Sequence, residues 1–269
     1  MTARTSPHAP ARTSPTPPRS SRTAPPTAAR TTTLAAPRPA GRTVPLPSPL
    51  VTQVAPDVWV ARGGRRRWAA VAPHPLDRES ADGLPPWRAA EFLASRALLR
   101  ALLATTLPAL ADAPVTADAD GRPVLDGHPD TGISISHDGE AVAVAVAPHR
   151  TVGVDVQLPQ DRAPESLLRR CLGGHADAVL HLPERQRAAE LAWVWTAQEA
   201  CVKAAGTGLA GRPWQIDVPP HQLLGRWGEF TWVSLRGRSR TPLSCAFTAT
   251  RPRDLHLPVR GAALEAPCP

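Results

Sequence analysis

One long helix is predicted by the sequence Leu191-Ala-Trp-Val-Trp-Thr-Ala-Gln-Glu-Ala-Cys-Val-Lys-Ala-Ala-Gly-Thr-Gly-Leu209, which holds the only lysine of the chain. Its Ala, Leu, Gln, Glu and Lys residues favour helix, and Gly206 and Gly208 stand where a glycine commonly ends one. Nearly all its other side chains are apolar or small, so most of the helix surface should be buried. The two charged residues, Glu199 and Lys203, are four apart and therefore share one face, together with Trp195.

The pair Glu199 and Lys203 has two interpretations. An exposed ion pair at this spacing is common and contributes only about 0.3 kcal/mol. Composition favours a functional role, because Lys203 is the only lysine among 31 basic residues. A lone ammonium group in an arginine-rich chain suggests a position where a compact charge is needed and a guanidinium does not fit.

The first fifty residues differ in composition from the rest. They contain 12 prolines and 7 arginines but no acidic and no aromatic residue. Such a segment has too little to bury to offset the entropy of ordering, so residues 1–50 are predicted to be a disordered tail. The net charge of +8 divides into +7 in this tail and +1 in the remainder, so the high pI says little about the domain. Residues 252–269 are again rich in proline and predicted to be loose.

Cysteine spacing and hydropathy exclude several protein classes. The four cysteines have no paired spacing, which argues against a zinc site or a disulfide framework. No apolar run follows the basic tail as in a signal peptide, and the longest apolar run, residues 141–147, is too short to cross a bilayer. We therefore expect a cytoplasmic protein with free thiols and no membrane partner. The cysteines are Cys171, Cys201, Cys245 and Cys268.

Before residue 150 the pattern predicts strands, one long helix and more strands. Residues 58–60 and 68–72 are predicted strands joined by a basic turn, 87–107 a helix and 118–129 a loop. A short acidic helix is possible within 73–86. In the long helix Arg96 and Arg100 share a face, which is either solvated or a phosphate-binding edge.

Residues 133–156 hold the strongest β pattern, with apolar residues at every second position. Three short strands joined by tight turns, the first turn at 137–139, predict an antiparallel meander. The valines of the third strand occupy one face, so Gly153, Asp155 and Gln157 occupy the other. On this pattern alone Asp155 also fits a wet strand face, and Ser136 and His137 also fit a turn.

After residue 150 the predicted order is repeated in outline. Helices are predicted at 164–180 and 183–206, followed by strands at 214–218, 229–233 and 243–248. This order indicates a duplicated architecture with its seam near residue 150.

The polar residues point to a metal and a phosphorylated substrate. Asp155 on a strand and Glu199 on a helix could converge on one cation, and oxygen ligands without paired Cys or His favour Mg²⁺, with Mn²⁺ possible. Mg²⁺ bound in this way completes its shell with water and substrate phosphates, and Lys203 would pair with a phosphate. No Walker loop, GxGxxG or kinase signature is present, which argues against an ordinary ATP or NAD site. Further donors are offered by Arg122, Ser136 and His137.

Four segments together resemble the Sfp-type 4′-phosphopantetheinyl transferases, which activate carrier proteins of polyketide, peptide and fatty-acid synthesis. The segments occur in the family's order over roughly residues 56–250. Each alone is a weak signal, but all four at the family's spacing are a strong one. They are Phe92-Leu-Ala-Ser-Arg-Ala-Leu-Leu-Arg100; Gly121-Arg-Pro123 with Ile135-Ser-His137; Gly153-Val-Asp-Val-Gln157; and Trp195-Thr-Ala-Gln-Glu-Ala-Cys-Val-Lys203 with Gly206-Thr-Gly-Leu209.

The resemblance implies an α+β fold of two similar α/β halves, 51–150 and 151–251, related by pseudo-twofold symmetry with coenzyme A between them. It implies an activity of the holo-[acyl-carrier-protein] synthase type. The 4′-phosphopantetheine group of coenzyme A moves to a serine of an apo acyl or peptidyl carrier protein, and 3′,5′-ADP leaves. We expect a monomer without a nucleic-acid partner, serving polyketide or nonribosomal peptide biosynthesis.

The resemblance also implies residue roles. Asp155, Gln157 and Glu199 would hold Mg²⁺, and Glu199 would accept the serine proton directly or through a water. Lys203 would stabilise charge on the phosphates. Ser136, His137 and Arg122 would contact the phosphates of coenzyme A, with His137 near the 3′-phosphate and Arg122 where the family often has lysine.

Two positions depart from the family's pattern. Gln157 stands where the metal motif often has Glu, so the site has one negative charge fewer and should bind Mg²⁺ more weakly. Gln198 stands where lysine is common, and no role is assigned to it. The Gln157 departure leaves open a module that keeps the fold only to bind a carrier protein or nucleic acid, with the arginine-rich tail as its contact arm. A metal-dependent phosphohydrolase acting on nucleotides is a third hypothesis.

Overall fold

The computed structural model describes residues 47–249. The predicted tails, 1–50 and 252–269, lie outside this range except for residues 47–50, and the first strand begins at Leu50. None of the helices within the described range combines the length and the apolar character that a membrane span needs.

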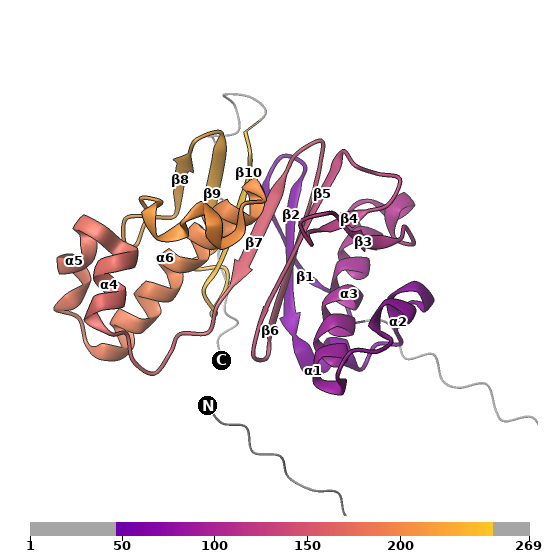
Figure 1. Cartoon of the computed structure of the whole chain (residues 1–269), viewed down its shortest axis with the longest axis horizontal. Coiled ribbons are helices and arrows are strands. Elements are labelled where there is room, and N and C mark those ends of the chain that lie inside the picture. Colours follow the sequence, from indigo (N-terminus) through magenta and orange to yellow (C-terminus); the bar gives the residue numbers. More distant parts are fainter. Residues whose placement is uncertain (1–46, 250–269) are drawn as a thin grey trace, which may run out of the picture. The chain divides into compact units, whose positions relative to one another are not determined.

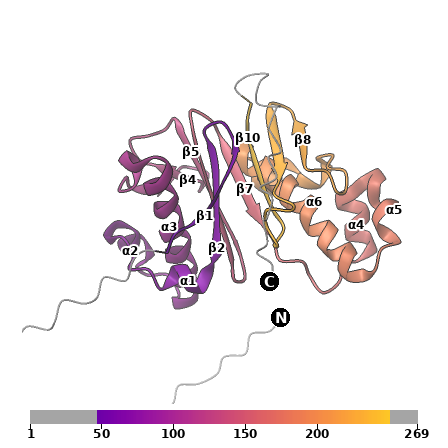
Figure 2. The same ribbon diagram turned by 180° about the vertical axis from the view of Figure 1, so that it is seen from behind.

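Two four-stranded antiparallel sheets, each covered by one long helix, form the described part of the chain. The helix α3 (Pro86–Thr106) packs on the first sheet and α6 (Glu184–Ala205) on the second. Figures 1 and 2 show from opposite sides that the sheets lie face to face with the helices outside. The first sheet has the order β1 (Leu50–Ala55), β2 (Val58–Gly64), β6 (Ala141–Pro148), β5 (Thr131–Asp138). The second has the order β7 (Val152–Val156), β10 (Leu243–Thr248), β9 (Phe230–Ser234), β8 (Leu224–Trp227).

The remaining elements are short. They are α1 (Arg65–Ala69), α2 (Pro75–Ala81), α4 (Glu165–Leu172) and α5 (Ala176–Leu180); the hairpin β3 (Val115–Ala117) and β4 (Pro123–Leu125); and the 3₁₀ turns η1 (Pro108–Leu110), η2 (Gly173–His175), η3 (Gly208–Gly211) and η4 (Pro213–Gln215).

Three apolar layers form the core: one between α3 and the first sheet, one between the two sheets, and one between the second sheet and α6. Alternation of side chains along the strands assigns residues to these layers. In β6 the valines face α3 and the alanines face the second sheet, where small side chains let the two sheets approach. In β7 the valines join the layer between the sheets, and Gly153 lies against α6. The predicted division of this strand into a valine face and a Gly153–Asp155 face is therefore confirmed.

Both long helices and the strand at 243–248 are confirmed as α3, α6 and β10. Gly206 ends α6 in the left-handed conformation, as predicted. Strands β1, β3, β4 and β8 were not predicted, and β4 lies within the predicted loop 118–129. The predicted helix 164–180 is divided where Gly173, with φ of 52°, ends α4.

Two predicted strands are wrong. Residues 65–69 form α1 because the indole of buried Trp68 folds back over Gly63, where a Cβ would lie 2.0 Å from its Nε1. Residues 214–218 form no strand, since η4 begins at Pro213 and the carbonyl of Ile216 accepts a hydrogen bond from the side chain of Gln198 instead of from a neighbouring strand.

The predicted meander is half right. Strands β5 and β6 form the antiparallel hairpin, but its turn is Gly139-Glu140, since β5 continues to Asp138. Strand β7 leaves this sheet and pairs with β10. Its neighbour on the other side is β5, and the contact between these two strands forms the centre of the candidate site.

Candidate active site

Strand β5 presents two different faces. Ile133, Ile135 and His137 point toward the side of the sheet that carries α3. Ser134 and Ser136 alternate with them and point toward β7. The side chains of the consecutive residues Ser136 and His137 therefore lie on opposite faces of the sheet, Ser136 toward β7 and His137 toward the α3 side.

Side-chain oxygens of β5 replace a backbone ladder between β5 and β7. The backbone N–H of Val154 donates to Ser134 Oγ (3.0 Å), that of Val156 to Ser136 Oγ (3.2 Å), and that of Leu158 to Asp138 Oδ2 (2.6 Å). These three bonds, called the side-chain ladder below, repeat every two residues in both strands. They fix the register of β7 and thereby position Asp155 and Gln157, which lie between the bonded N–H groups.

The first of these residues, Asp155, is buried, with only 6% of its surface exposed. Its Oδ1 accepts hydrogen bonds from Ser136 Oγ (2.8 Å) and Lys203 Nζ (2.5 Å), and Lys203 Nζ also lies 3.2 Å from Ser136 Oγ. The wet-face interpretation of Asp155 is therefore wrong. Lys203 is ion-paired across the structure with Asp155 and makes no such pair with Glu199. Ser136, Asp155, Glu199 and Lys203 are called the Asp155 cluster below.

Gly153 brings β7 and α6 close enough for this cluster to form. A Cβ at Gly153 would lie 2.1 Å from the carbonyl oxygen of Ala200 and 2.5 Å from the backbone nitrogen of Ala204. Only glycine leaves room for the helix backbone at this point. The close approach places the Lys203 side chain beside Asp155, two residues further along β7.

The Asp155 cluster contains more negative than positive charge. Burial is the largest effect on Asp155 and raises its pKa, while Lys203 opposes this rise. Burial also raises the pKa of Glu199, and the nearby charge of Asp155 adds to it. Half-buried Glu199 forms no hydrogen bond or ion pair with any residue of 47–249.

Two neighbouring carboxylates, of which only Asp155 is paired with an ammonium group, suit a further cation with oxygen ligands, such as Mg²⁺. Within the described range no group of three or more His, Cys, Asp or Glu side chains is arranged to hold a metal. A metal at Asp155 and Glu199 would therefore take its other ligands from water, substrate or neutral protein oxygens.

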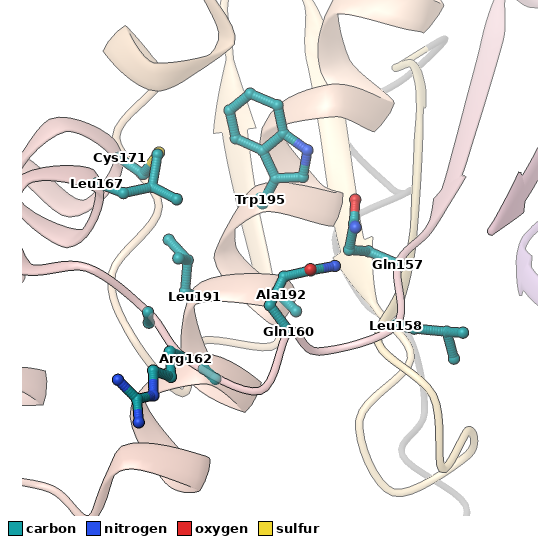
Figure 3. Close-up of a pocket in the computed structure, with 11 residues that line it drawn as sticks. Gln157, Leu158, Gln160, Arg162, Leu167, Cys171, Leu191, Ala192 and Trp195 are labelled. Carbon is teal, nitrogen blue, oxygen red and sulfur yellow. The ribbon is translucent and has the colours of Figure 1, made fainter. Parts of the chain in front are cut away.

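Gln157 lies at the edge of this cluster. Its Nε2 donates to Asp138 Oδ2 at 3.1 Å. The side chain also lines an apolar pocket of about 180 Å³ between the loop after β7, α4 and α6. Figure 3 shows Gln157 near Trp195 of α6, and Leu191 of the same helix on the side toward Leu167 and Cys171. The pocket was not predicted, although Trp195 was placed on the stripe of Glu199 and Lys203.

On the other face of β5, the first two of the four family segments meet in a hollow of about 380 Å³, called the Arg96 hollow below. Arg96 is buried, its Nε and Nη1 have no hydrogen-bond partner, and its guanidinium lies 4.8 Å from the ring centroid of Phe92. Burial lowers its pKa to about 10, so Arg96 remains charged at neutral pH. The lining residues include Arg88, Phe92, Ser95, Arg96, Gly121, Pro123 and His137.

Arg96 and Arg100 do not act together. Arg100 forms a two-pronged ion pair with buried Asp77 and donates to the carbonyl of Ala111 (2.8 Å), so it holds α2 and η1 on α3. The phosphate-edge interpretation remains for Arg96 alone.

Arg122 lies apart from His137. Its guanidinium covers Gly206 at the end of α6, where a Cβ would lie 2.3 Å from Nη1. It lines a separate hollow of about 580 Å³, while its neighbours Gly121 and Pro123 line the Arg96 hollow. Predicted site residues are thus distributed over the Asp155 cluster, the Arg96 hollow and the end of α6.

Asp138 is the site residue that the sequence analysis missed. The signal was the spacing of two in Ser134-Ile-Ser136-His-Asp138, which continues the polar face of β5 to a carboxylate. A turn assigned at 137–139 concealed it.

Comparisons with known proteins identify two matching families. Residues 151–239 match the 4′-phosphopantetheinyl transferase superfamily, and residues 80–147 match the 4′-phosphopantetheinyl transferase N-terminal domain. The chain is 32% identical over 133 residues to 4′-phosphopantetheinyl transferase AcpT of Salmonella typhi, covering 48% of this chain and 63% of that protein. It is 31% identical over 121 residues to AcpT of Escherichia coli strain K12, covering 44% and 58%. The matches span less than two-thirds of the length of these relatives.

Proposed function

Because the chain belongs to the 4′-phosphopantetheinyl transferase family, we propose that it transfers the 4′-phosphopantetheine group of coenzyme A to a serine of an apo carrier protein. One observation supports this proposal most strongly. The Arg96 hollow, in which two buried nitrogens of Arg96 have no hydrogen-bond partner, lies on one face of β5. The Asp155 cluster, with its carboxylates and Lys203, lies on the other face. This arrangement suits a substrate with phosphates at two separate positions, such as coenzyme A.

We propose that the 3′-phosphate of coenzyme A binds in the Arg96 hollow. The two free nitrogens of Arg96 are buried donors that a phosphate would satisfy, and His137 and Arg88 line the same hollow. We keep His137 as a partner of the 3′-phosphate in this proposal and add Arg96, which lines the same hollow. Arg122 would contribute from the end of α6 rather than from this hollow.

The pyrophosphate would lie at the Asp155 cluster. Asp155 and Glu199 would hold Mg²⁺, or Mn²⁺, which when bound neutralises charge on the phosphates. Lys203 supplies a fixed positive charge at the same point, and Ser136 holds Asp155 in place.

The reaction is the transfer of a phosphopantetheinyl group from one oxygen to another. The hydroxyl oxygen of the carrier serine forms a bond to the β-phosphorus of coenzyme A, and the bond from that phosphorus to the bridging oxygen breaks. The leaving group is 3′,5′-ADP. Glu199 accepts the serine proton directly or through a water.

The apolar pocket beside Gln157 would accept the pantetheine arm. It is lined by Trp195, Leu191 and Ala192, and also by Gln157, which follows Asp155 by two residues in the sequence. An uncharged, partly aliphatic chain suits such a lining.

We also propose a domain organisation, an oligomeric state, a localisation and a class of acceptor for the whole protein. Residues 51–150 and 151–251 are two halves related by a pseudo-twofold axis, and the protein is a cytoplasmic monomer of the Sfp type. The activity is of the holo-[acyl-carrier-protein] synthase type. Acyl or peptidyl carrier domains of polyketide or nonribosomal peptide biosynthesis are the acceptors.

The test is intact-protein mass spectrometry of an apo acyl carrier protein and an apo peptidyl carrier protein after incubation with this protein, coenzyme A and Mg²⁺. We expect a mass gain equal to phosphopantetheine that disappears with chelator and falls by about 10³-fold in rate for Asp155→Asn. The matched control Asp82→Asn, at an exposed aspartate, should keep full activity. Release of 3′,5′-ADP without a mass gain on either carrier would favour a phosphohydrolase. Carrier or nucleic-acid binding without turnover would favour a binding module.

A further inference from the structure

The last bond of the side-chain ladder differs from the other two. Ser134 and Ser136 are neutral, but Asp138 places a carboxylate opposite the residue at which this chain departs from its family, Gln157. Asp138 Oδ2 accepts from the backbone N–H of Leu158 and from Gln157 Nε2. A charged residue at the ladder's end is therefore joined to the predicted metal-binding segment by two hydrogen bonds.

The carboxylate of Asp138 determines which way the amide of Gln157 faces. An ionised carboxylate only accepts hydrogen bonds, so the donor end of the amide, Nε2, must face it. The assignment of nitrogen and oxygen in Gln157 is thus fixed by chemistry. The acceptor end, Oε1, forms no hydrogen bond with any residue of 47–249 and is available to another donor or to a metal.

We infer that Asp138 is a positioning residue for the metal site and acts as a pair with Gln157. Asp138 holds the amide so that Oε1 is a neutral third oxygen ligand beside Asp155 and Glu199. The inference rests on the proposed function, since it needs a metal at the Asp155 cluster. Asp138 itself acts through Gln157 and is not a ligand.

The pair also explains why glutamine is tolerated at position 157. A glutamate there would bring two carboxylates to about the 3.1 Å that now separates Gln157 Nε2 from Asp138 Oδ2. Like charges at such a distance repel each other strongly. In this chain the pair of Asp138 and Gln157 carries one negative charge, which is on Asp138. The carboxylate that position 157 lacks is therefore present on the neighbouring strand β5. A Gln157→Glu substitution alone should therefore fail to improve metal binding, contrary to the simple expectation from the family's pattern.

The experiment is a double-mutant cycle with Mn²⁺ alone as the probe, without coenzyme A or carrier protein. The variants are Asp138→Asn, Gln157→Glu and the double variant, and the readouts are the Mn²⁺ dissociation constant from electron paramagnetic resonance and the melting temperature in chelator. The amide that Asp138→Asn introduces can still accept from Leu158 N–H, but it also offers a donor to Gln157 Oε1, so the amide of Gln157 can turn and lose its free oxygen. Asp82→Asn is the matched control.

We expect Asp138→Asn to weaken Mn²⁺ binding by about 10-fold, as is typical when a partner of a metal ligand is lost, with the melting temperature nearly unchanged. Gln157→Glu should lower the melting temperature in chelator, and adding Asp138→Asn should restore it. In the double variant Mn²⁺ binding should be at least as tight as in the wild type. The two substitutions would then be strongly non-additive.

A purely structural role for Asp138 predicts a different result. In that case Asp138→Asn lowers the melting temperature and leaves Mn²⁺ affinity unchanged, or the two substitutions add, and the inference is overturned. If Asp155→Asn abolishes Mn²⁺ binding while Asp138→Asn has no effect, the proposed function stands and only this inference fails. If the wild type binds no Mn²⁺ and modifies no carrier, both fail together.

Discussion

The two long helices each bury one charged side chain, and the two charges are treated in opposite ways. Glu190 of α6 is 3% exposed and accepts hydrogen bonds from Arg236 Nη2 (2.5 Å) and the backbone N–H of His221 (2.7 Å). His221 Nδ1 lies 3.2 Å from Glu190 Oε2, and the guanidinium of Arg236 also stacks over the ring of Trp193. Arg96 of α3 is 8% exposed, yet its Nε and Nη1 have no partner.

The difference separates a structural charge from a functional one. A buried charge whose hydrogen bonds are all made joins parts of the fold, here α6 with the loops at 221 and 236. A buried charge with unmet hydrogen bonds costs free energy, and such a cost persists where a ligand relieves it. Arg236 Nε also lacks a hydrogen-bond partner, but Glu190 neutralises this guanidinium, whereas Arg96 forms no ion pair with any residue of 47–249. We therefore propose Arg96, and not Glu190, as the position of an anion.

The largest expected effect is on Glu190. Glu190→Ala leaves the mostly buried guanidinium of Arg236 without its carboxylate, and breaking a buried pair in this way costs about 3 kcal/mol. Urea unfolding should show this loss, while the KM for coenzyme A in the folded protein stays unchanged. Glu184→Ala, at a more exposed position of the same helix, is the control and should cost less than about 1 kcal/mol. A raised KM without lost stability would place Glu190 on the functional side of the comparison.

The sequence predicted the elements whose stability is local or periodic. Helices α3 and α6 follow from composition and length, and the two faces of β7 follow from alternation. Lys203 was singled out because it is unique in composition, and it lies in the Asp155 cluster, paired with Asp155.

The sequence could not predict features that depend on distant partners. The departure of β7 from the first sheet depends on serine hydroxyls that replace backbone bonds, and no local pattern distinguishes this from a meander. The folding back of Trp68 depends on an absent side chain at Gly63. Arg96 and Arg100 are equivalent on a helical wheel, and only the position of Asp77 separates their roles.

A sharper test of the comparison is Arg96→Met, which removes the unmet charge and keeps an apolar side chain of similar length. We expect the free energy of unfolding to stay equal or to rise, because no hydrogen bond of Nε or Nη1 is lost. The KM for coenzyme A should increase about 10-fold or more, since hydrogen bonds to charged groups contribute about 1.5–3 kcal/mol, with kcat little changed.

Dephospho-coenzyme A, which lacks the 3′-phosphate, identifies the anion that Arg96 binds. The wild type should bind it as weakly as Arg96→Met binds coenzyme A, and the variant should not distinguish the two substrates. Arg100→Met is the matched control and should destabilise the protein, because it leaves buried Asp77 unpaired. A variant that still prefers coenzyme A by the wild-type factor would show that the 3′-phosphate binds elsewhere.

The smallest expected effect concerns Glu199, a half-buried charge without a partner among residues 47–249, which should resemble Arg96 and not Glu190. Burial and Asp155 raise its pKa in the folded state, so the folded protein binds this proton more tightly than the unfolded chain. Stability then falls as pH rises from the usual glutamate pKa through the raised value, and above the raised value the full penalty is present. In chelator, Glu199→Gln should therefore melt above the wild type by an amount that grows with pH to about 2 °C, and the difference should vanish at a pH below the usual glutamate pKa. Adding Mn²⁺ should reverse the order, because only the wild type gains the metal's stabilisation. A lower melting temperature for Glu199→Gln in chelator would mean that this carboxylate holds the fold together, as Glu190 does, and would remove it from the set of residues that bind a ligand.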